Sequence, residues 1–488
     1  MEPMKKRKAL IAVDLGAQSC RVSLLRFWYD EPAVDVVHRF SNAPVSSDKG
    51  LHWNIEEIWE GVQAGIRKCA ALATEGIASI GIDGWAVDYV RMHESGYAEA
   101  DPYCYRDVRT ERAESEVHGL ISPERLYELT GTQILRINTI YQLFADKLGG
   151  KDEAIPWVNL PEYITYRLCG SAVAEYTNAT HSGLVAVGVH RWSKEVFDSI
   201  GLNLAAAPRI VASGTTVGNL RGDLAELSAL QETKVIVPAC HDTASAIAAI
   251  PATGDDWAFI SSGTWSLVGT VLDAPCVSEE ARAQNFTNLG GVGGKICFLK
   301  NVNGMWLLRQ CMDEWEAKGV VWKLDDLLRE CQSLAPPSHL IDVDAAELMV
   351  PGAAIAKINA QLARAGAKPI VADSVGAPAI ANVVFHSLAE RYANVLRSIE
   401  STAEKKLRRV FIVGGGNKNQ LLNRLTREKS GLDVVLGSPE STTVGNFAIQ
   451  LAALDGEWTP GVGVPGEAVA RWAHRLTSIS IAIPATAR

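Results

Sequence analysis

The sequence predicts an α/β protein, and three observations lead to this prediction. The chain has 488 residues, more than one ordinary hydrophobic core accommodates, which points to two or three domains. Its first half alternates strand-like and helical segments, as is typical of an α/β domain. A hairpin pattern near the N-terminus returns half a chain later, as an internal duplication would produce. Two hairpins can also resemble each other by chance.

Each half of the chain opens with two apolar strands around a turn of small and polar residues. The four strands span residues 9–13, 22–27, 257–260 and 265–272. Between the halves, the stretch 251–256 combines Pro, Gly and Asp, the residues of a turn or a domain hinge. We therefore expect an N-terminal domain over residues 1–250, a C-terminal domain over 255–455 and a surface extension over 456–488.

Further elements follow from local patterns. Asn54 begins a helix after the first hairpin, because Glu57 stands three residues on, the spacing of a capping box. Residues 77–82 form a strand-like apolar run. In the second half, apolar residues recur at helical spacing over 380–399, and the strand 410–413 runs directly into three glycines.

Composition and charge narrow the function classes. A hydrophobic fraction of 47% with 21% charged residues is typical of a folded, soluble protein. The formal net charge of -9 leaves no basic excess to neutralise phosphates, so we expect no nucleic-acid partner. The dense basic runs, in residues 5–8 and 405–409, each precede an apolar strand, and we interpret them as solvated strand entrances.

Cysteine usage and the N-terminal residues favour the cytoplasm. The nine cysteines are scattered, without the paired spacing of a metal site or a disulfide framework, which predicts reduced thiols. The apolar run over residues 9–13 stops at Asp14, so it is too short for a signal core or a membrane span. We therefore expect a cytoplasmic protein without a membrane partner.

Asp14 ends the first apolar strand and stands two residues before Gly16. A carboxylate in that place can face a metal-bound phosphate, while the glycine lets backbone N–H groups approach the anion. The alternative is an ordinary turn aspartate, and this segment alone favours the alternative.

Two further segments of small residues could approach a nucleotide. The turn 262–264, Ser-Gly-Thr, can present N–H and hydroxyl donors to phosphate oxygens, although such turns are common. Gly414-Gly415-Gly416 follows a buried strand, and three glycines weaken a fold unless the backbone must come close to a partner such as an adenosine. A tight packing turn explains the three glycines equally well.

Asp242 follows the strand 235–237 and precedes the helical run 244–250. Ligands of open α/β sheets bind at the carboxyl ends of strands, which makes Asp242 a candidate catalytic base. Aspartate is also a favoured helix N-cap, and the local sequence slightly favours capping. On the other side, His241 and Thr243 flank the aspartate, and the small residues that follow leave space for a ligand.

Signatures of other catalytic frameworks are absent from the sequence. It contains no Walker A run and no kinase-type G-x-G-x-x-G-x-V, which excludes the two commonest phosphoryl-transfer frameworks. It contains neither a G-x-S-x-G nucleophile elbow nor an H-E-x-x-H zinc motif.

Taken together, these segments resemble the FGGY carbohydrate kinases, and within them the rhamnulokinases. The matching stretches are residues 12–17, 80–83, 105–110, 175–180, 241–246, 261–266 and 412–416, in family order. The combination of His-Asp-Thr-Ala-Ser-Ala with Ser-Ser-Gly-Thr-Trp-Ser is the most specific feature, and the resemblance covers nearly the whole chain. It implies two actin-like ATPase (ribonuclease H-like) α/β domains with an interdomain cleft, the first binding the sugar and the second the nucleotide.

The resemblance implies ATP-dependent transfer of the γ-phosphoryl group to the 1-hydroxyl of L-rhamnulose, with magnesium as the cofactor. The residues it assigns to ATP are Ala17, Gln18, Ser19, Cys20, Arg21, Thr264 and Gly415. Those it assigns to the sugar are Ala86, His241, Asp242, Thr243 and Asn301. Asp242 would accept the proton of the attacking hydroxyl, and Asp14 would lie near the magnesium and act through water. The expected partners are ATP and a small ketose, bound by a monomer or homodimer.

This chain departs from the family pattern near both ligands. Ala86 stands where the family usually has the glycine of Trp-Gly-Val-Asp, and its methyl group can reshape the sugar pocket. Arg309 replaces a family glutamine that approaches ATP, so that contact is not carried over, and Cys20 stands where glycine is common. L-fuculose and L-xylulose are therefore alternative substrates. A non-catalytic sugar or nucleotide sensor is a further alternative, which the intact Asp14, Asp242 and glycine run disfavour.

Overall fold

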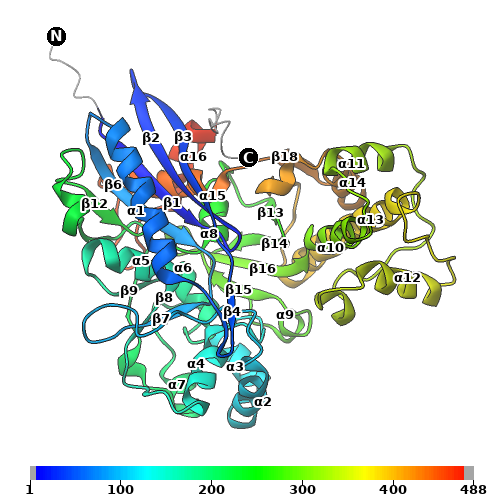
Figure 1. The fold of residues 1–488 in the computed structure, drawn as a ribbon, viewed down its shortest axis with the longest axis horizontal. Coiled ribbons are helices and arrows are strands. Elements are labelled where there is room, and N and C mark those ends of the chain that lie inside the picture. The colour runs from blue at the N-terminus through cyan, green and yellow to red at the C-terminus, as the bar shows by residue number, and fades with distance from the viewer. Residues whose placement is uncertain (1–6, 478–488) are drawn as a thin grey trace. The chain divides into compact units, whose positions relative to one another are not determined.

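The computed structural model of the protein describes residues 7–477, and the chain divides into two compact units. Unit 1 comprises Met1–Ala252, Val271–Phe298 and Glu440–Arg488, and unit 2 comprises Thr253–Thr270 and Leu299–Pro439. Each unit contains its own mixture of strands and helices, which Figure 1 colours along the chain. The predicted α/β class is therefore confirmed. Lys5 and Lys6 of the N-terminal basic run, and residues 478–488 of the predicted extension, lie outside the described residues.

A six-stranded sheet forms the centre of unit 1, in the order β11-β12-β6-β1-β2-β3. Its strands are β1 (Ala9–Leu15), β2 (Ser19–Trp28), β3 (Glu31–Ser41), β6 (Ile77–Gly84), β11 (Thr216–Asn219) and β12 (Lys234–Ile236). Strands β1, β2 and β3 are antiparallel neighbours, whereas β6 runs parallel to β1 and β12 runs parallel to β6. The carboxyl ends of β1, β6 and β12 therefore meet at one end of the sheet.

Shorter strands and eleven described helices complete unit 1. The strands are β4 (Val45–Ser47), β5 (Gly50–His52), β7 (Tyr89–Arg91), β8 (Trp157–Asn159), β9 (Val173–Glu175), β10 (Arg209–Val211) and β15 (Thr287–Gly290). The helices are α1 (Ile55–Leu72), α2 (Thr110–Leu120), α3 (Pro123–Thr130), α4 (Thr139–Leu148), α5 (Leu160–Cys169), α6 (Tyr176–Ala179), α7 (Lys194–Ile200), α8 (Asp242–Ala248), α9 (Glu279–Ala283), α15 (Ser441–Leu454) and α16 (Gly466–Thr477).

Helices cover both faces of the central sheet of unit 1 (Figure 1). On one face, Ile11 of β1 shares a buried cluster with Val62 of α1 and Ile164 of α5. On the other face, Leu10 of β1 lies in a buried cluster with Phe447 of α15. Because successive side chains of a strand point to opposite faces, a strand covered on both sides must be apolar throughout. This explains why the opening strand is an unbroken apolar run.

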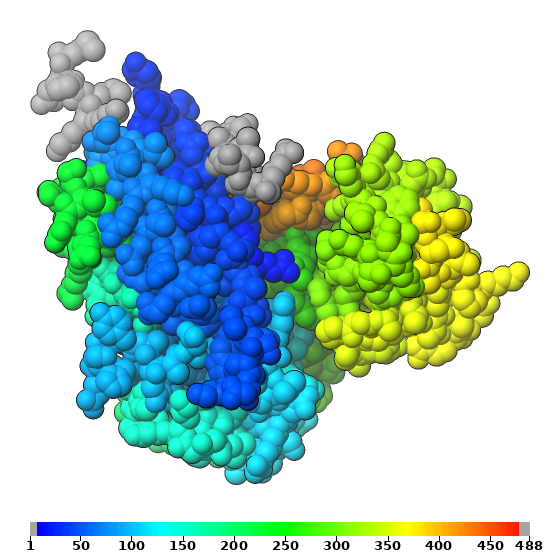
Figure 2. Space-filling view, viewed as in Figure 1, coloured from blue at the N-terminus to red at the C-terminus, as the bar shows by residue number. Residues whose placement is uncertain are grey.

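The predicted opening hairpin and first helix are confirmed. Asp14 of β1 pairs with Arg21 of β2 across the turn. At the start of α1, the side chain of Asn54 accepts a hydrogen bond from the backbone N–H of Glu57 at 3.1 Å, and its amide donates to the Glu57 carboxylate at 3.2 Å. The predicted N-cap at Asn54 is therefore confirmed, but Glu57 bonds back to the side chain of Asn54 and not to its backbone N–H, as a full capping box would require. Figure 2 shows the β2–β3 hairpin, in dark blue, at the surface of unit 1. Trp28 and Tyr29, at the turn of this hairpin, are exposed.

The C-terminal helix α16 differs from the surface extension predicted for that part of the chain. Val469, Trp472 and Leu476 recur at helical spacing and are buried in the same cluster as Phe447 of α15. Trp472 is only 7% exposed. The Pro and Gly content that indicated an extension belongs to the loop before the helix, whereas the helix itself completes the core of unit 1.

Unit 2 repeats the combination of an antiparallel hairpin and a parallel neighbour. Its strands are β13 (Trp257–Ser262), β14 (Trp265–Leu272, with its last two residues in unit 1), β16 (Ile296–Asn303, from Leu299 onward in unit 2), β17 (Arg409–Val413) and β18 (Asp433–Leu436). They follow the order β16-β14-β13-β17-β18, with β13 antiparallel to β14 and parallel to β17. The predicted second hairpin and the strand over 410–413 are therefore confirmed.

Unit 2 also contains five helices. They are α10 (Trp306–Ala317), α11 (Leu324–Gln332), α12 (Ala354–Arg364), α13 (Ala377–Thr402) and α14 (Gln420–Ser430). The helical spacing predicted over 380–399 lies within α13, whose Phe385, Leu388 and Tyr392 are buried. The Tyr392 hydroxyl lies 2.6 Å from the Ser266 hydroxyl of β14, which ties the helix to the sheet.

All nine cysteines are free thiols, and only Cys276 is not fully buried. Within residues 7–477, no helix has the combined length and apolar character that spanning a membrane requires.

Candidate active site

Three aspartates meet at the carboxyl ends of adjacent strands in unit 1. Asp14 of β1 and Asp83 of β6 are register partners. Asp242 begins α8, after β12, on the other side of β6. The segment before Asp242 is joined to the end of β6, because the N–H of Gly84 donates to the carbonyl of Cys240 at 2.9 Å. The sheet order β12-β6-β1 thus places Asp83 between the two aspartates that the sequence singled out. This end of an open α/β sheet is where ligands bind.

Asp14 is nearly buried and pairs with Arg21 across the opening hairpin. Arg21 Nη1 donates to Asp14 Oδ2 at 2.8 Å and to Glu440 Oε2 at 3.1 Å. Arg39 Nη2 lies 3.8 Å from Glu440 Oε1. Burial raises the pKa of Asp14 to about 6, and the positive charge of Arg21 acts in the opposite direction. Two arginines and two carboxylates therefore form one connected charge cluster.

Asp83 is the most enclosed of the three aspartates, with no exposed surface. Asn446 of α15 donates from Nδ2 to Asp83 Oδ2 at 2.5 Å, whereas Oδ1 has no partner among the described residues. Burial, and next the charge of Asp14, raise the pKa of Asp83 well above its ordinary value. A Cβ on Gly81 would lie 2.6 Å from Asn446 Oδ1, so this glycine permits the close approach of α15.

Asp242 has a more open environment. Its side chain is 35% exposed, compared with 7% for Asp14. Thr243 Oγ1 donates to Asp242 Oδ1 at 3.1 Å, and His241 Nε2 lies 3.4 Å from the same oxygen. Burial raises the pKa of Asp242 to about 6, while the hydrogen bonds from Thr243 and the charge of Arg21 lower it.

The alternative that Asp242 is the N-cap of helix α8 is wrong, because the N-cap lies one residue earlier. His241 occupies the N-cap of α8 without a side-chain cap bond, and Asp242 is the first helical residue. The Asp242 carboxylate accepts a hydrogen bond from the backbone N–H of Thr243 within the same first turn, which lowers its pKa.

The other residues predicted to contact ATP in unit 1 lie in and after the first turn. Ala17 is half-buried against the core, and Asn42 donates from Nδ2 to the carbonyl of Gly16 at 3.0 Å. Cys20 is buried in β2. Ser19 Oγ and Arg21 Nε are buried polar atoms without a partner among the described residues. Gln18 accepts a hydrogen bond from the N–H of Asn42 at its carbonyl, 3.0 Å away. The turn is thus held by hydrogen bonds to its backbone carbonyls, whereas the side-chain donors of Ser19 and Arg21 remain available.

Ala86 lies in a turn after β6 that hydrogen bonds to Asp88 hold in place. Trp53 and Trp85 donate from their indole N–H groups to Asp88 Oδ2, at 2.6 and 2.9 Å. Between Ala86 and Asp88, Val87 has a φ of 72°, a conformation that branched side chains rarely adopt. The buried carboxylate of Asp88 therefore stabilises a strained turn that carries Ala86, which is 9% exposed.

Unit 2 contains the remaining predicted residues, Thr264, Gly415 and Asn301. Thr264 lies in the turn of the β13–β14 hairpin, and its carbonyl accepts from the N–H of Trp306 at 3.1 Å. Asn301 lies in β16 and is half-buried. Arg309 forms an ion pair with Asp313 at 2.6 Å.

The three consecutive glycines of unit 2 have different surroundings. A Cβ on Gly416 would lie 2.0 Å from Ser262 Oγ, and one on Gly414 would lie 2.9 Å from the Ser262 carbonyl. A Cβ on Gly415 would meet nothing within 4 Å. Gly414 and Gly416 are therefore required by packing against β13, whereas open space borders Gly415.

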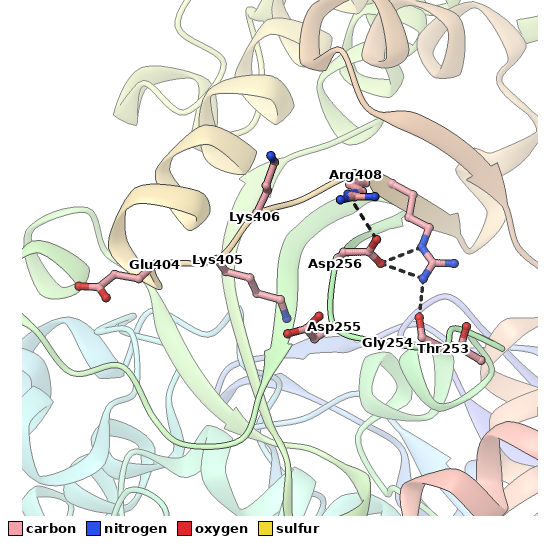
Figure 3. Close-up of a pocket in the computed structure, with 9 residues that line it drawn as sticks. Thr253, Gly254, Asp255, Asp256, Glu404, Lys405, Lys406 and Arg408 are labelled. Carbon is pink, nitrogen blue, oxygen red and sulfur yellow. Dashed lines mark hydrogen bonds and ion pairs between the residues drawn. The ribbon is translucent and has the colours of Figure 1, made fainter.

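A charged depression of about 560 Å³ lies elsewhere in unit 2, and it contains none of the predicted site residues (Figure 3). Residues 253–256 and 404–409 form most of its wall. Arg409 pairs with Asp256 at 2.8 Å and also donates to the carbonyl of Thr253. The second basic run therefore lies at the entrance of β17, as predicted, and is partly neutralised there.

Sequence reasoning missed four candidate residues of this site: Asp83, Glu440, Asn446 and His181. His181 contacts His241, with 3.9 Å between their ring centroids. Asp83 ends an apolar strand as Asp14 does, so the same signal could have identified it. The other three carry no local signal, because only the packing of distant segments brings them to the strand ends.

The chain matches two models of one protein family. The N-terminal domain of the FGGY family of carbohydrate kinases matches residues 9–249, and the C-terminal domain of the same family matches residues 258–454. The chain belongs to the FGGY family of carbohydrate kinases. Members of this family use ATP, so this FGGY kinase is a phosphotransferase that acts on a carbohydrate.

Several relatives of this FGGY kinase are rhamnulokinases by name. The rhamnulokinase of Bacteroides thetaiotaomicron is 35% identical over 463 residues, which cover 94% of this chain and 93% of that protein. The rhamnulokinase of Oceanobacillus iheyensis is 34% identical over 459 residues, which cover 91% of this chain and 93% of that protein.

Solved structures confirm the actin-like fold of this FGGY kinase. A ligand-bound xylulose kinase from Lactobacillus acidophilus aligns with a TM-score of 0.74 at 15% identity, covering 97% of this chain and 96% of that chain. Plasmodium falciparum glycerol kinase with ADP aligns with a TM-score of 0.70 at 12% identity, covering 98% of this chain and 95% of that chain. At such identities the likeness concerns the fold alone.

Proposed function

We propose that this FGGY kinase transfers the γ-phosphoryl group of ATP to the 1-hydroxyl of L-rhamnulose, giving L-rhamnulose 1-phosphate and ADP. The names of its relatives support this choice of sugar. The observation that supports Asp242 as the proton acceptor is its exposure. Of the three strand-end aspartates, Asp242 has a side chain that is 35% exposed, whereas Asp14 is at 7% and Asp83 is fully buried.

In the proposed reaction, the 1-hydroxyl oxygen forms a bond to the γ-phosphorus as the bond from phosphorus to the β-bridging oxygen breaks. ADP leaves with the electron pair of that bond, and the hydroxyl proton passes to the carboxylate of Asp242. Asp242 also orients the hydroxyl, since phosphoryl transfer depends mainly on positioning and charge stabilisation. His241 and Thr243 flank this carboxylate and are the proposed sugar contacts beside it, together with Asn301.

The reaction also requires groups that stabilise the negative charge of the phosphates. The proposed donors are the backbone N–H groups of the turn 17–20, the Ser19 hydroxyl and the Arg21 guanidinium. Ser19 Oγ and Arg21 Nε lack partners among the described residues, so each has hydrogen-bonding capacity that a ligand can satisfy. In unit 2, Thr264 is proposed to contact phosphate, and the open space at Gly415 fits a nucleotide close to the backbone.

The strand-end carboxylates fit a magnesium ion that arrives with the nucleotide. Within residues 7–477, no group of three or more His, Cys, Asp or Glu side chains could hold a metal ion. Magnesium is commonly held by one or two carboxylates, waters and substrate phosphates, and the surplus of negative charge beside Arg21 favours a cation. Asp14 is the residue proposed to hold it, through water. The ion would neutralise charge on the transferred phosphate.

A panel of ketoses tests the proposed substrate. The assay couples ADP release to NADH oxidation, with L-rhamnulose, L-fuculose and L-xylulose as acceptors. We expect the highest kcat/KM with L-rhamnulose, and preference for another ketose would contradict the proposal. ADP release with none of the sugars, together with measurable ATP binding, would indicate a sensor instead of an enzyme.

Ala86 motivates the second candidate, a kinase of another ketose. Its methyl group occupies a turn whose position is set by Asp88, so the backbone has little freedom to move away from a bulkier sugar substituent. Ala86→Gly should therefore change the ratio of kcat/KM values between L-rhamnulose and the other ketoses. An exposed Ala→Gly change, Ala365→Gly, is the matched control and should leave that ratio unchanged.

A further inference from the structure

Two imidazole rings contact each other beside the proposed proton acceptor, with their planes inclined by 57°. His181 Nε2 lies 3.0 Å from His241 Nδ1, and the ring centroids are 3.9 Å apart. On its other side, His241 Nε2 lies 3.4 Å from Asp242 Oδ1. The three side chains therefore form a continuous line from His181 to the carboxylate of Asp242.

Both histidines are neutral at physiological pH. Burial lowers the pKa of His241 to about 3. Burial, and next the charge of His241, lower the pKa of His181 well below its ordinary value. In a pair of neutral imidazoles joined by one hydrogen bond, one nitrogen donates and the other accepts. Two arrangements are therefore open for the contact between Nε2 of His181 and Nδ1 of His241.

The charge of Asp242 selects between these arrangements. If His241 donated from Nδ1, its Nε2 would carry a lone pair 3.4 Å from a carboxylate oxygen, which is repulsive. If His181 donates from Nε2, His241 carries its proton on Nε2 and presents an N–H group to that oxygen. The second arrangement gives attraction at both contacts.

We infer that His181 is a positioning residue, which donates to His241 Nδ1 and thereby holds the proton of His241 on Nε2, beside Asp242 Oδ1. The inference rests on the proposed role of Asp242 as the proton acceptor. Thr243 Oγ1 also donates to Oδ1, at 3.1 Å. With two donors at Oδ1, the other oxygen, Oδ2, is the one directed to receive the sugar proton.

A buried network holds the two histidines in register. The Glu175 carboxylate accepts from the N–H of Cys240 at 2.9 Å, from Thr177 N at 3.0 Å and from Ser213 Oγ at 2.7 Å. It thereby joins the segment before His241 to helix α6. Asn138 Nδ2 donates to the carbonyl of His181 at 3.0 Å, which fixes the short turn after that helix. Each ring is thus carried on anchored backbone.

Charged groups on neighbouring elements also face Asp242, and their effect on its pKa does not depend on His181. Arg21 of β2 lowers the pKa of Asp242, and the charge of Asp242 in turn raises the pKa values of Asp14 on β1 and Asp83 on β6. A change at His181 therefore acts on Asp242 through His241 and leaves these charges in place.

Two variants of His181 distinguish the effect of its N–H donor from the effect of its side-chain volume. His181→Gln keeps an N–H donor near the position of Nε2, whereas His181→Leu keeps volume without a donor. We expect the leucine variant to lower kcat about 10- to 100-fold with little change in KM for the ketose, and glutamine to restore most of the loss. Equal activity of the leucine variant and the wild type, or loss without rescue by glutamine, would overturn the inference.

A direct measurement of the tautomer does not depend on catalysis. In protein labelled with ¹⁵N-histidine, two-bond ¹H–¹⁵N correlations report which ring nitrogen carries the proton, and spectra of His181→Gln assign the signals of this pair. We expect Nε2 of His241 to be protonated in the wild type, and protonation at Nδ1 would contradict the inference even if the leucine variant fails to fold. Asp242→Asn tests the proposed function separately, because full activity of that variant would exclude Asp242 as the base without altering the tautomer result.

Discussion

Asp14 and Asp83 are register partners on adjacent parallel strands, and both carboxylates are buried at the same end of the sheet. Their partners differ: Asp14 is paired with the cation Arg21, whereas Asp83 is bonded to the neutral amide of Asn446. A buried carboxylate without a cation favours its protonated form. The Asp83 carboxyl therefore favours its protonated form more than Asp14 does, so Asp14 is the one suited to a cation and Asp83 the one suited to holding helix α15.

Asp83→Asn should raise the melting temperature more at about pH 8 than at about pH 5.5. Burial, and next Asp14, raise the pKa of Asp83, so the folded protein retains a proton that the unfolded chain has released. The stability that this proton contributes is fully present below the unfolded pKa and is lost as pH rises through the folded pKa. Asparagine keeps the shape and removes the titration. Thermal unfolding at both pH values measures the difference, and exposed Asp223→Asn, the control, should show none.

Asp242→Asn should lower kcat by about 10²- to 10⁴-fold while ATP binding persists, because only the proton acceptor is removed. Wild-type activity should also fall on the acid side with an apparent pKa near 6, since burial raises the pKa of Asp242 to about 6 and protonation removes the base. Initial rates across pH and calorimetric titration with ATP check both statements. An acid limb that persists unchanged in the residual activity of the asparagine variant would assign it to another group.

Gly416→Ala should lower the stability of the protein, whereas Gly415→Ala should weaken its use of ATP. The first places a methyl group 2.0 Å from Ser262 Oγ and should lower the free energy of unfolding by about 1–3 kcal/mol. The second meets open space, so stability should change by less than about 0.5 kcal/mol while KM for ATP rises. Urea unfolding and ATP-dependent rates distinguish them. Normal KM for ATP in a stable Gly415→Ala protein would remove Gly415 from the proposed nucleotide contacts.

Arg21 and Glu440 should be energetically coupled. Arg21→Met leaves two buried carboxylates without their shared cation, and Glu440→Gln removes one of these charges. A double-mutant cycle on the free energy of unfolding should give a coupling of about 0.5–2 kcal/mol, discounted because Arg21 is partly exposed. Adding Asp14→Asn to Arg21→Met should recover part of the lost stability. Purely additive effects would show that the short distances in this cluster contribute little.

Local patterns in the sequence predicted those parts that local physics controls. The two hairpins, the N-cap at Asn54 and the strand leading into the glycines depend on residues close together in the chain, and all are present. The surface placement of the last helix was wrong, because Trp472 and its apolar neighbours are covered by a helix that the sequence pattern does not connect to them. Asp242 was found as a strand-end aspartate, but its place as the first helical residue depends on the turn geometry.

By itself, the sequence determined the α/β class, the family and the candidate base, since short motifs and their order carry that information. Only the tertiary structure decided which carboxylates meet. Residues 14, 83 and 440 converge because sheet order and the packing of α15 bring distant segments together, and no local periodicity records those contacts. The same holds for His181, whose ring meets His241 across 60 residues of chain. Strand ends are visible in a sequence, whereas their neighbours are set by burial and hydrogen bonding in the folded protein.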